Sequence, residues 1–168
     1  MSADVLDELA ARLGAALKRR GAKLATAESC TGGLVAARLT SVPGSSQVFV
    51  GSVVAYSNSV KQAELGVSSS LLAEHGAVSA EAAAAMAAGA RERLGADVAV
   101  AVTGIAGPGG GTPEKPVGLV FLHAETPEGA DGIEFTLPGD RDTIRSRAAV
   151  GGLHLVRRLL TQSRHRGA

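Results

Sequence analysis

Residues 26–33, T-A-E-S-C-T-G-G, place a hydroxyl group beside a glycine-led helix start. They follow an apolar run of strand type, so we expect Ser29 at a strand end, where ligands of α/β sheets commonly bind. A helix that begins at Gly32 or Gly33 would present unpaired backbone N–H groups to a phosphate, a carboxylate or a developing oxyanion. The segment therefore predicts a nucleophile and an anion site in one turn. A plain Ser/Thr N-cap is the alternative that the segment alone leaves open.

A serine nucleophile needs a base, and the histidines supply no obvious one. They are His75, His123, His154 and His165. No G-x-S-x-G elbow or S-x-x-K pair surrounds Ser29 either. Tyr56, the only tyrosine, ends an apolar run, and Lys61 follows it in a helical segment. A neutral lysine can act as a base, and burial favours that form. Tyr56 could relay the proton or position the substrate. The alternatives are a surface lysine and an amphipathic tyrosine at the core edge.

A second glycine-rich segment, residues 103–111, follows the apolar run 98–102 directly. Its sequence, T-G-I-A-G-P-G-G-G, lacks the Lys-Ser/Thr ending of a P-loop, and Pro113 and Pro116 follow where a dinucleotide fold would continue into a helix. We expect backbone N–H donors near a ligand, with Lys115 as an added charge, and keep a mobile surface loop as the alternative. The candidate binding residues here are Thr103, Gly104, Ala106 and Gly107.

Two arginines are four residues apart in the last helical segment, so Arg141 and Arg145 share a face near its N-terminus. The helix dipole and the guanidinium groups both favour an anion there. Ion pairs with Asp140 and Asp142 are the alternative. Cys30 is a competing nucleophile, but a lone buried cysteine is usually inert, and its side chain points differently from that of Ser29.

Hydrophobic periodicity and the positions of turn-forming and capping residues predict the helices and strands that position these residues. The expected helices are 4–20, a helix that begins at Gly32 or Gly33 and ends before Pro43, 58–65, 69–75, 81–94 after a Ser79 N-cap, and one from about Asp140. The expected strands are 22–28, 48–56, 98–102, 117–124 and 133–137. Helices and buried strands alternate, which indicates an α/β domain. Turn residues 126–129 indicate an antiparallel hairpin. We predict a three-layer α/β/α sandwich with a mixed, mostly parallel sheet.

Composition limits the class of protein. A chain of 168 residues suits a single domain, with a core at about 5–160 and a basic tail at 161–168. Aromatic residues make up 2% and the formal net charge is +1, so we do not expect a nucleic-acid partner. The basic cluster near the C-terminus is interpreted as a solvated tail. It consists of Arg157, Arg158, Arg164 and Arg166.

The single cysteine cannot form an internal disulfide or a cysteine-rich metal site. Asp4, Asp7 and Glu8 near the N-terminus are unlike a signal peptide, and no apolar run reaches the roughly 20 residues of a membrane helix. We therefore expect a cytoplasmic protein with no membrane partner.

Six motifs in order resemble the CinA C-terminal domain family, also called PncC or nicotinamide-nucleotide amidohydrolase. They are A-E-S-C-T-G-G at 27–33, A-Y-S-N at 55–58 with Lys61, H-G-A-V-S at 75–79, T-G-I-A-G-P-G-G at 103–110, K-P-V-G at 115–118 and G-D-R at 139–141. The resemblance covers roughly residues 5–160. The pyrophosphatase-type domain of longer CinA proteins has no counterpart in this sequence, so its metal-dependent chemistry is not implied.

The resemblance implies deamidation of nicotinamide mononucleotide to nicotinic acid mononucleotide and ammonia, with no cofactor and no metal. It implies Ser29 as nucleophile and Tyr56 and Lys61 as its activating partners. Cys30, Thr31, Gly32 and Gly33, the glycine loop and the two arginines are the expected substrate contacts, and a homodimer is the expected assembly. The alternative function is a non-catalytic nucleotide-binding or competence-associated interaction module.

Overall fold

The computed structural model describes residues 3–162, with side-chain surroundings from residue 7 onward. The elements follow the chain as α1 (Ala3–Arg20), β1 (Leu24–Glu28), α2 (Leu34–Thr40), η1 (Ser45–Gln47), β2 (Phe49–Val54), α3 (Asn58–Leu65), α4 (Ser69–His75), α5 (Ala80–Arg93), β3 (Val98–Gly104), β4 (Leu119–Thr126), β5 (Gly129–Thr136) and α6 (Arg141–Gln162).

In this described part of the chain the strands form one sheet of five strands in the order β2-β1-β3-β4-β5. β1 pairs in parallel with both β2 and β3, whereas β4 is antiparallel to both β3 and β5. Four strands therefore point the same way and only β4 is reversed. The predicted mixed, mostly parallel sheet and the hairpin at 126–129 are confirmed.

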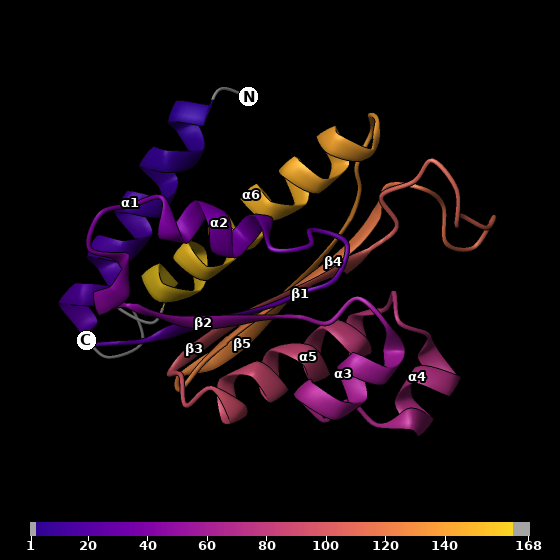
Figure 1. Cartoon of the computed structure of the whole chain (residues 1–168), viewed down its shortest axis with the longest axis horizontal. Helices are drawn as coiled ribbons and strands as arrows, with labels where there is room; N and C mark the ends of the chain where they lie inside the picture. Colours follow the sequence, from indigo (N-terminus) through magenta and orange to yellow (C-terminus); the bar gives the residue numbers. More distant parts are fainter. Residues whose placement is uncertain (1–2, 163–168) are drawn as a thin grey trace.

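Two helical layers cover the sheet (Figure 1): α1, α2 and α6 lie on one face, and α3, α4 and α5 on the other. The first layer packs with Leu, Val and Ile side chains, among them Leu13, Leu153 and Val102, none more than 1% exposed. The second layer is built mostly from alanines of α5 and of the central strands. The predicted α/β/α sandwich is confirmed, with each layer formed by three helices.

Several predicted boundaries shift for local reasons. β3 extends to Gly104 because Thr103 and Gly104 pair with β4. β5 begins at Gly129 because its first residues continue the hairpin ladder. The η1 turn was not predicted. Helices α3 and α4 match their predicted limits, since Ser57 and Ser68 accept hydrogen bonds from N–H groups of the first turn. Arg164, His165 and Arg166 of the predicted basic tail lie outside the described residues.

Among the helices of residues 3–162, none is long and apolar enough to cross a membrane. The chemistry-bearing residues gather instead at one end of the sheet. The loop after β3 and the first turn of α6 lie at this end (Figure 1), beyond the carboxyl end of β1.

Candidate active site

Ser29 lies immediately after β1, as predicted, and is 9% exposed. Its backbone N–H donates to the Val102 carbonyl at 2.9 Å, which continues the β1–β3 pairing by one residue. The backbone then turns at once, because the Gly32 N–H donates to the Ser29 carbonyl at 3.0 Å. Gly32 and Gly33 have φ angles of 60° and 102°, a region that favours glycine. The sequence T-G-G thus allows the reversal that leaves Ser29 at the strand end.

Lys61 reaches Ser29 from helix α3. Its Nζ lies 3.1 Å from Ser29 Oγ, 2.8 Å from the Ala55 carbonyl oxygen and 3.2 Å from the Tyr56 carbonyl oxygen. Only 1% of Lys61 is exposed, although charged residues are almost never fully buried without a partner. None of the ion pairs among the described residues includes it. The predicted Ser29–Lys61 pair is brought together, and the surface-lysine alternative is wrong.

Burial lowers the pKa of Lys61 from its ordinary value, and the nearby Cys30 opposes this shift only in part. A neutral amine has two N–H donors and one lone pair. The Ala55 and Tyr56 carbonyls can accept the two N–H groups, which leaves the lone pair for the Ser29 hydroxyl proton. This arrangement suits general-base activation of an alcohol.

Tyr56 contacts Lys61 through its backbone carbonyl and not through its phenol. The side chain is 60% exposed, and its hydroxyl accepts a hydrogen bond from Arg141 Nη2 at 3.0 Å. The structure thus joins Tyr56 to both Lys61 and Arg141, by two different groups of the same residue.

Glu28 is a buried residue of the site that the sequence patterns did not single out. It is 0% exposed, and its carboxylate accepts from the Thr31 hydroxyl at 2.7 Å and from the N–H groups of Gly33, Val35 and Ala36 at 2.9–3.1 Å. The expectation that the first N–H groups of α2 are unpaired is therefore wrong, because Glu28 caps them. An acidic residue at the end of an apolar strand, a few residues before a helix start, is the sequence signal for this role.

The two arginines of α6 both reach the site, as their shared face predicted. Arg141 Nη1 donates to the Gly107 carbonyl at 2.8 Å. Arg145 donates from Nε and Nη2 to the Cys30 and Thr31 carbonyls, both at 3.1 Å. The ion-pair alternative holds only for Arg145, whose Nη1 lies 3.7 Å from Asp142. Arg141 is exposed and Arg145 is half-buried.

The predicted glycine loop divides into a packed part and an open part. The Thr103 hydroxyl donates to the Ala77 carbonyl at 2.7 Å, and a Cβ on Gly104 would lie 2.7 Å from the Leu119 carbonyl oxygen. Ala106 and Gly107 are buried, whereas residues 108–114 are exposed. Lys115 Nζ donates to the His75 carbonyl at 2.7 Å, which ties the loop to the end of α4.

Cys30 is buried beside the site, and this burial raises the pKa of its thiol to about 11. The backbone N–H of Cys30 and the charges of Arg145 and Lys61 lower the pKa less than desolvation raises it. A thiol with this pKa is protonated at neutral pH and is a poor nucleophile. Cys30 therefore does not compete with Ser29.

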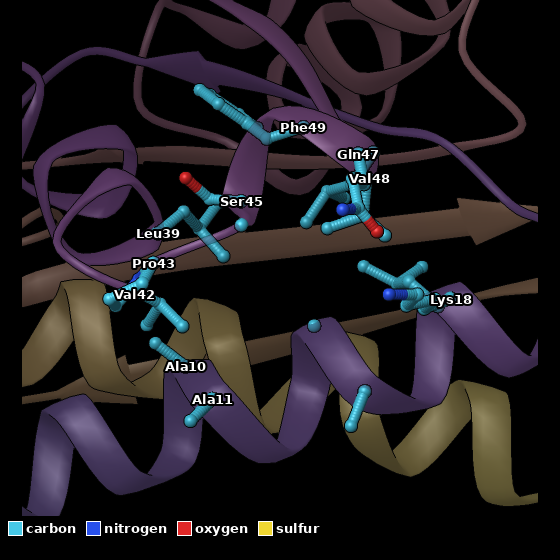
Figure 2. Close-up of a pocket in the computed structure, with 15 residues that line it drawn as sticks. Ala10, Ala11, Lys18, Leu39, Val42, Pro43, Ser45, Gln47, Val48 and Phe49 are labelled. Carbon is cyan, nitrogen blue, oxygen red and sulfur yellow. The ribbon is translucent and has the colours of Figure 1, made fainter.

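A cavity of about 240 Å³ lies at the opposite end of β1, near Leu24. Figure 2 shows Ala10, Ala11 and Lys18 of α1 on one side and Leu39, Val42 and Pro43 on another. Its walls are apolar apart from Lys18, Ser45, Gln47 and backbone groups. It has no paired nucleophile and base, so the chemistry-bearing site is the one at Ser29.

Comparison with known proteins places these features in a family. The profile of the CinA C-terminal domain matches residues 6–160. A CinA-like protein of Mycolicibacterium paratuberculosis is 55% identical over 163 aligned residues, covering 94% of this chain and 36% of the relative. A CinA-like protein of Desulfotalea psychrophila is 52% identical over 156, covering 93% and 38%. The chain thus spans little more than a third of the length of these relatives.

Solved structures match over nearly their whole length. The competence/damage-inducible protein CihA of Agrobacterium tumefaciens superimposes with a TM-score of 0.90 at 44% identity, covering 92% of this chain and 94% of that one. A competence-damaged protein (CinA) superfamily member of Escherichia coli gives 0.90 at 32% identity, covering 95% and 92%.

Proposed function

Since this chain belongs to the CinA C-terminal domain family, we propose that it hydrolyses the carboxamide of nicotinamide mononucleotide to nicotinic acid mononucleotide and ammonia. The observation that carries this proposal is the buried Lys61 amine at 3.1 Å from Ser29 Oγ. A buried lysine whose pKa is lowered by desolvation, and whose amine contacts a serine hydroxyl, is typical of a functional site.

In the proposed reaction, neutral Lys61 takes the Ser29 hydroxyl proton while Ser29 Oγ attacks the carboxamide carbon. A tetrahedral oxyanion forms, and the Cys30 N–H or backbone N–H groups of the glycine loop stabilise it, since the Gly32 and Gly33 N–H groups already donate within the turn. The Lys61 ammonium then gives its proton to the departing nitrogen, which leaves as ammonia. Water attacks the resulting ester by the reverse proton path, and the acid is released with Ser29 restored.

Substrate contacts follow from the surroundings of Ser29. Arg141 is exposed at the N-terminus of α6, where the dipole and the guanidinium both favour a phosphate. We propose Arg141 as the phosphate ligand, and the loop from Thr103 to Gly107 as the wall against the ribose. Tyr56 is proposed to hold Lys61 by its carbonyl and Arg141 by its hydroxyl.

The test is turnover of nicotinamide mononucleotide by metal-stripped protein, with ammonia and the acid measured together. We expect stoichiometric release of both products, abolished in Ser29→Ala but unchanged in Ser41→Ala, which removes an exposed hydroxyl at the end of α2. No release by the wild type despite nucleotide binding would instead favour a non-catalytic binding module.

A further inference from the structure

The turn that carries Ser29 is held from two sides. On the inner side, Glu28 accepts hydrogen bonds from the Thr31 hydroxyl and from the Gly33 N–H. On the other side, Arg145 donates two hydrogen bonds, from Nε to the Cys30 carbonyl and from Nη2 to the Thr31 carbonyl. Arg145 belongs to α6, more than a hundred residues away in the sequence, so this contact depends on the tertiary fold.

These bonds decide which way the peptide groups of the turn face. In a planar trans peptide the C=O of one residue and the N–H of the next point in opposite directions. Because the Cys30 carbonyl faces Arg145, the Thr31 N–H points away from the α6 layer. Because the Ser29 carbonyl accepts from Gly32 inside the turn, the Cys30 N–H points out of it. The α3 layer, from which Lys61 reaches Ser29, is on the opposite face of the sheet from α6 (Figure 1).

Of these two groups, only the Cys30 N–H is accessible. Within residues 3–162, neither the Cys30 N–H nor the Thr31 N–H donates a hydrogen bond to another residue, and the Cys30 N–H acts only on its own thiol. Cys30 is 5% exposed, whereas Thr31 is 0% exposed, so a ligand can reach the Cys30 N–H but not the Thr31 N–H. Buried N–H groups without a partner are rare in folded proteins. The N–H of the residue after a serine nucleophile is a known donor to the oxyanion in α/β hydrolases.

We propose that Arg145 is a positioning residue that keeps the Cys30 N–H turned toward the oxyanion of the tetrahedral intermediate. By holding the Thr31 carbonyl, it fixes the next peptide group, whose Gly32 N–H holds the Ser29 carbonyl and so directs the Cys30 N–H out of the turn. The inference rests on the proposed amidase function and changes the expected role of Arg145. Its Nε and Nη2 are already engaged by carbonyls, and Nη1 faces Asp142. Arg141 also donates from Nη1 and Nη2, but it is exposed where Arg145 is half-buried, so Arg141 remains the arginine for the phosphate and Arg145 acts on the chemical step.

The test separates ground-state binding from stabilisation of the tetrahedral state. Arg145→Met removes both hydrogen bonds, and Arg145→Lys keeps the charge but cannot span two carbonyls. The matched control is Arg147→Met on the same helix, which removes a bond to the Pro138 carbonyl away from the turn. Nucleotide affinity is measured with each change in a Ser29→Ala background. The tetrahedral state is measured with pyridine-3-boronic acid, where Ser29 Oγ adds to boron and its proton passes to Lys61.

For Arg145→Met we expect kcat to fall roughly 100-fold, as for loss of an oxyanion donor, with nucleotide affinity within a factor of about three. The tetrahedral boronate, followed by ¹¹B NMR, should weaken to a similar degree in Arg145→Met and in Arg145→Lys, but not in Arg147→Met. Weaker nucleotide binding with an unchanged boronate would make Arg145 a phosphate ligand and overturn the inference.

Equal kcat and equal boronate affinity in Arg145→Met would also overturn it, while leaving the amidase proposal intact. Failure of the amidase proposal looks different, because then the wild type itself releases no ammonia and forms no boronate adduct.

Discussion

At the scale of single residues, Lys61 is unusual because a side chain that is ordinarily charged and exposed is buried here. It is fully buried with no ion pair among the described residues, yet all of its close polar contacts are oxygens. Desolvation therefore favours the neutral amine while the three oxygens keep it in place. Burial of Lys61 also lowers the free energy of unfolding, by an amount that depends on pH.

Lys61→Met should reduce turnover by a factor of about 100 or more, because the general base is lost. In the wild type, kcat/KM should rise with pH through an apparent pKa below 10.5, the ordinary lysine value, since only the neutral amine accepts the proton. A pH profile with no rising limb at any pH below 10 would contradict a lysine base.

The same variant tests the pKa shift through stability. Between the lowered folded pKa and 10.5, the unfolded chain binds more protons at Lys61 than the folded chain does. The free energy of unfolding of the wild type, minus that of Lys61→Met, should therefore rise with pH in this window. Urea denaturation of both proteins from pH 6 to pH 10 measures the difference, and a difference that falls with pH would refute the assignment.

Tyr56→Phe separates the two groups of Tyr56. Lys61 is held by the Tyr56 carbonyl, which the substitution leaves in place, while the hydroxyl lies at Arg141. We expect kcat to stay within a factor of about 10, since only one hydrogen bond to the exposed Arg141 is lost. Steady-state kinetics distinguish the two roles. If the phenol relays the proton, kcat should fall roughly 100-fold or more in Tyr56→Phe.

At the scale of elements, α2 depends on a carboxylate that precedes it by six residues. Both oxygens of Glu28 accept backbone N–H groups, Oε1 from Ala36 and Oε2 from Gly33 and Val35. A glutamine amide in either orientation would place an NH₂ donor against one of these N–H donors.

Glu28→Gln should therefore destabilise the fold by about 1–3 kcal/mol, and Glu28→Ala by roughly 3 kcal/mol or more, because buried N–H groups are left unsatisfied. Urea denaturation measures both changes. Glu64→Gln is the matched control, since Glu64 is an exposed residue of α3. If Glu28→Gln were as stable as this control, capping of α2 by Glu28 would be refuted.

The position of α3, and with it Lys61, depends on a close crossing with α5. A Cβ on Gly89 would lie 1.9 Å from the Leu65 carbonyl oxygen, so only glycine allows the two helices to approach this closely. Gly89→Ala should cost about 1–3 kcal/mol and should also lower turnover, because α3 must move.

Gly14→Ala in α1 is the control for helix propensity, since the nearest atom to its Cβ, Val48 Cγ2, is 4.0 Å away. It should be neutral or stabilise by up to about 1 kcal/mol. Thermal unfolding and turnover of the two variants provide the comparison, and an equally active and stable Gly89→Ala would refute the crossing argument.

At the scale of the whole molecule, strong local signals made most of the fold predictable. The Ser caps of α3 to α5 and the continuous apolar run of β3 marked their elements within a few residues. The alternation of helix and strand with one hairpin specified the layers. Local patterns did not predict the η1 turn, and they placed the start of α2 at Gly32 or Gly33 instead of Leu34.

The sequence predicted which residues gather at the site, but it predicted few of the hydrogen bonds between them. The resemblance to the family paired Ser29 with Lys61, and the structure brings the two side chains to 3.1 Å of each other. The role of Glu28 has a local signal, an acidic residue just before a helix start, that the motif analysis did not use. The contact of Arg145 with Cys30 spans 115 residues, and spacing does not encode it. The hydrogen bond between the Tyr56 hydroxyl and Arg141 spans 85 residues and is of the same kind.

The most direct test of the account is whether an acyl group passes through Ser29. Hydroxylamine added during turnover of nicotinamide mononucleotide intercepts an ester intermediate as a hydroxamate. We predict that hydroxamate appears at the expense of the acid, that ammonia release continues, and that all three products vanish in Ser29→Ala. Continued ammonia release with no hydroxamate, or turnover that survives in Ser29→Ala, would contradict the Ser29–Lys61 mechanism.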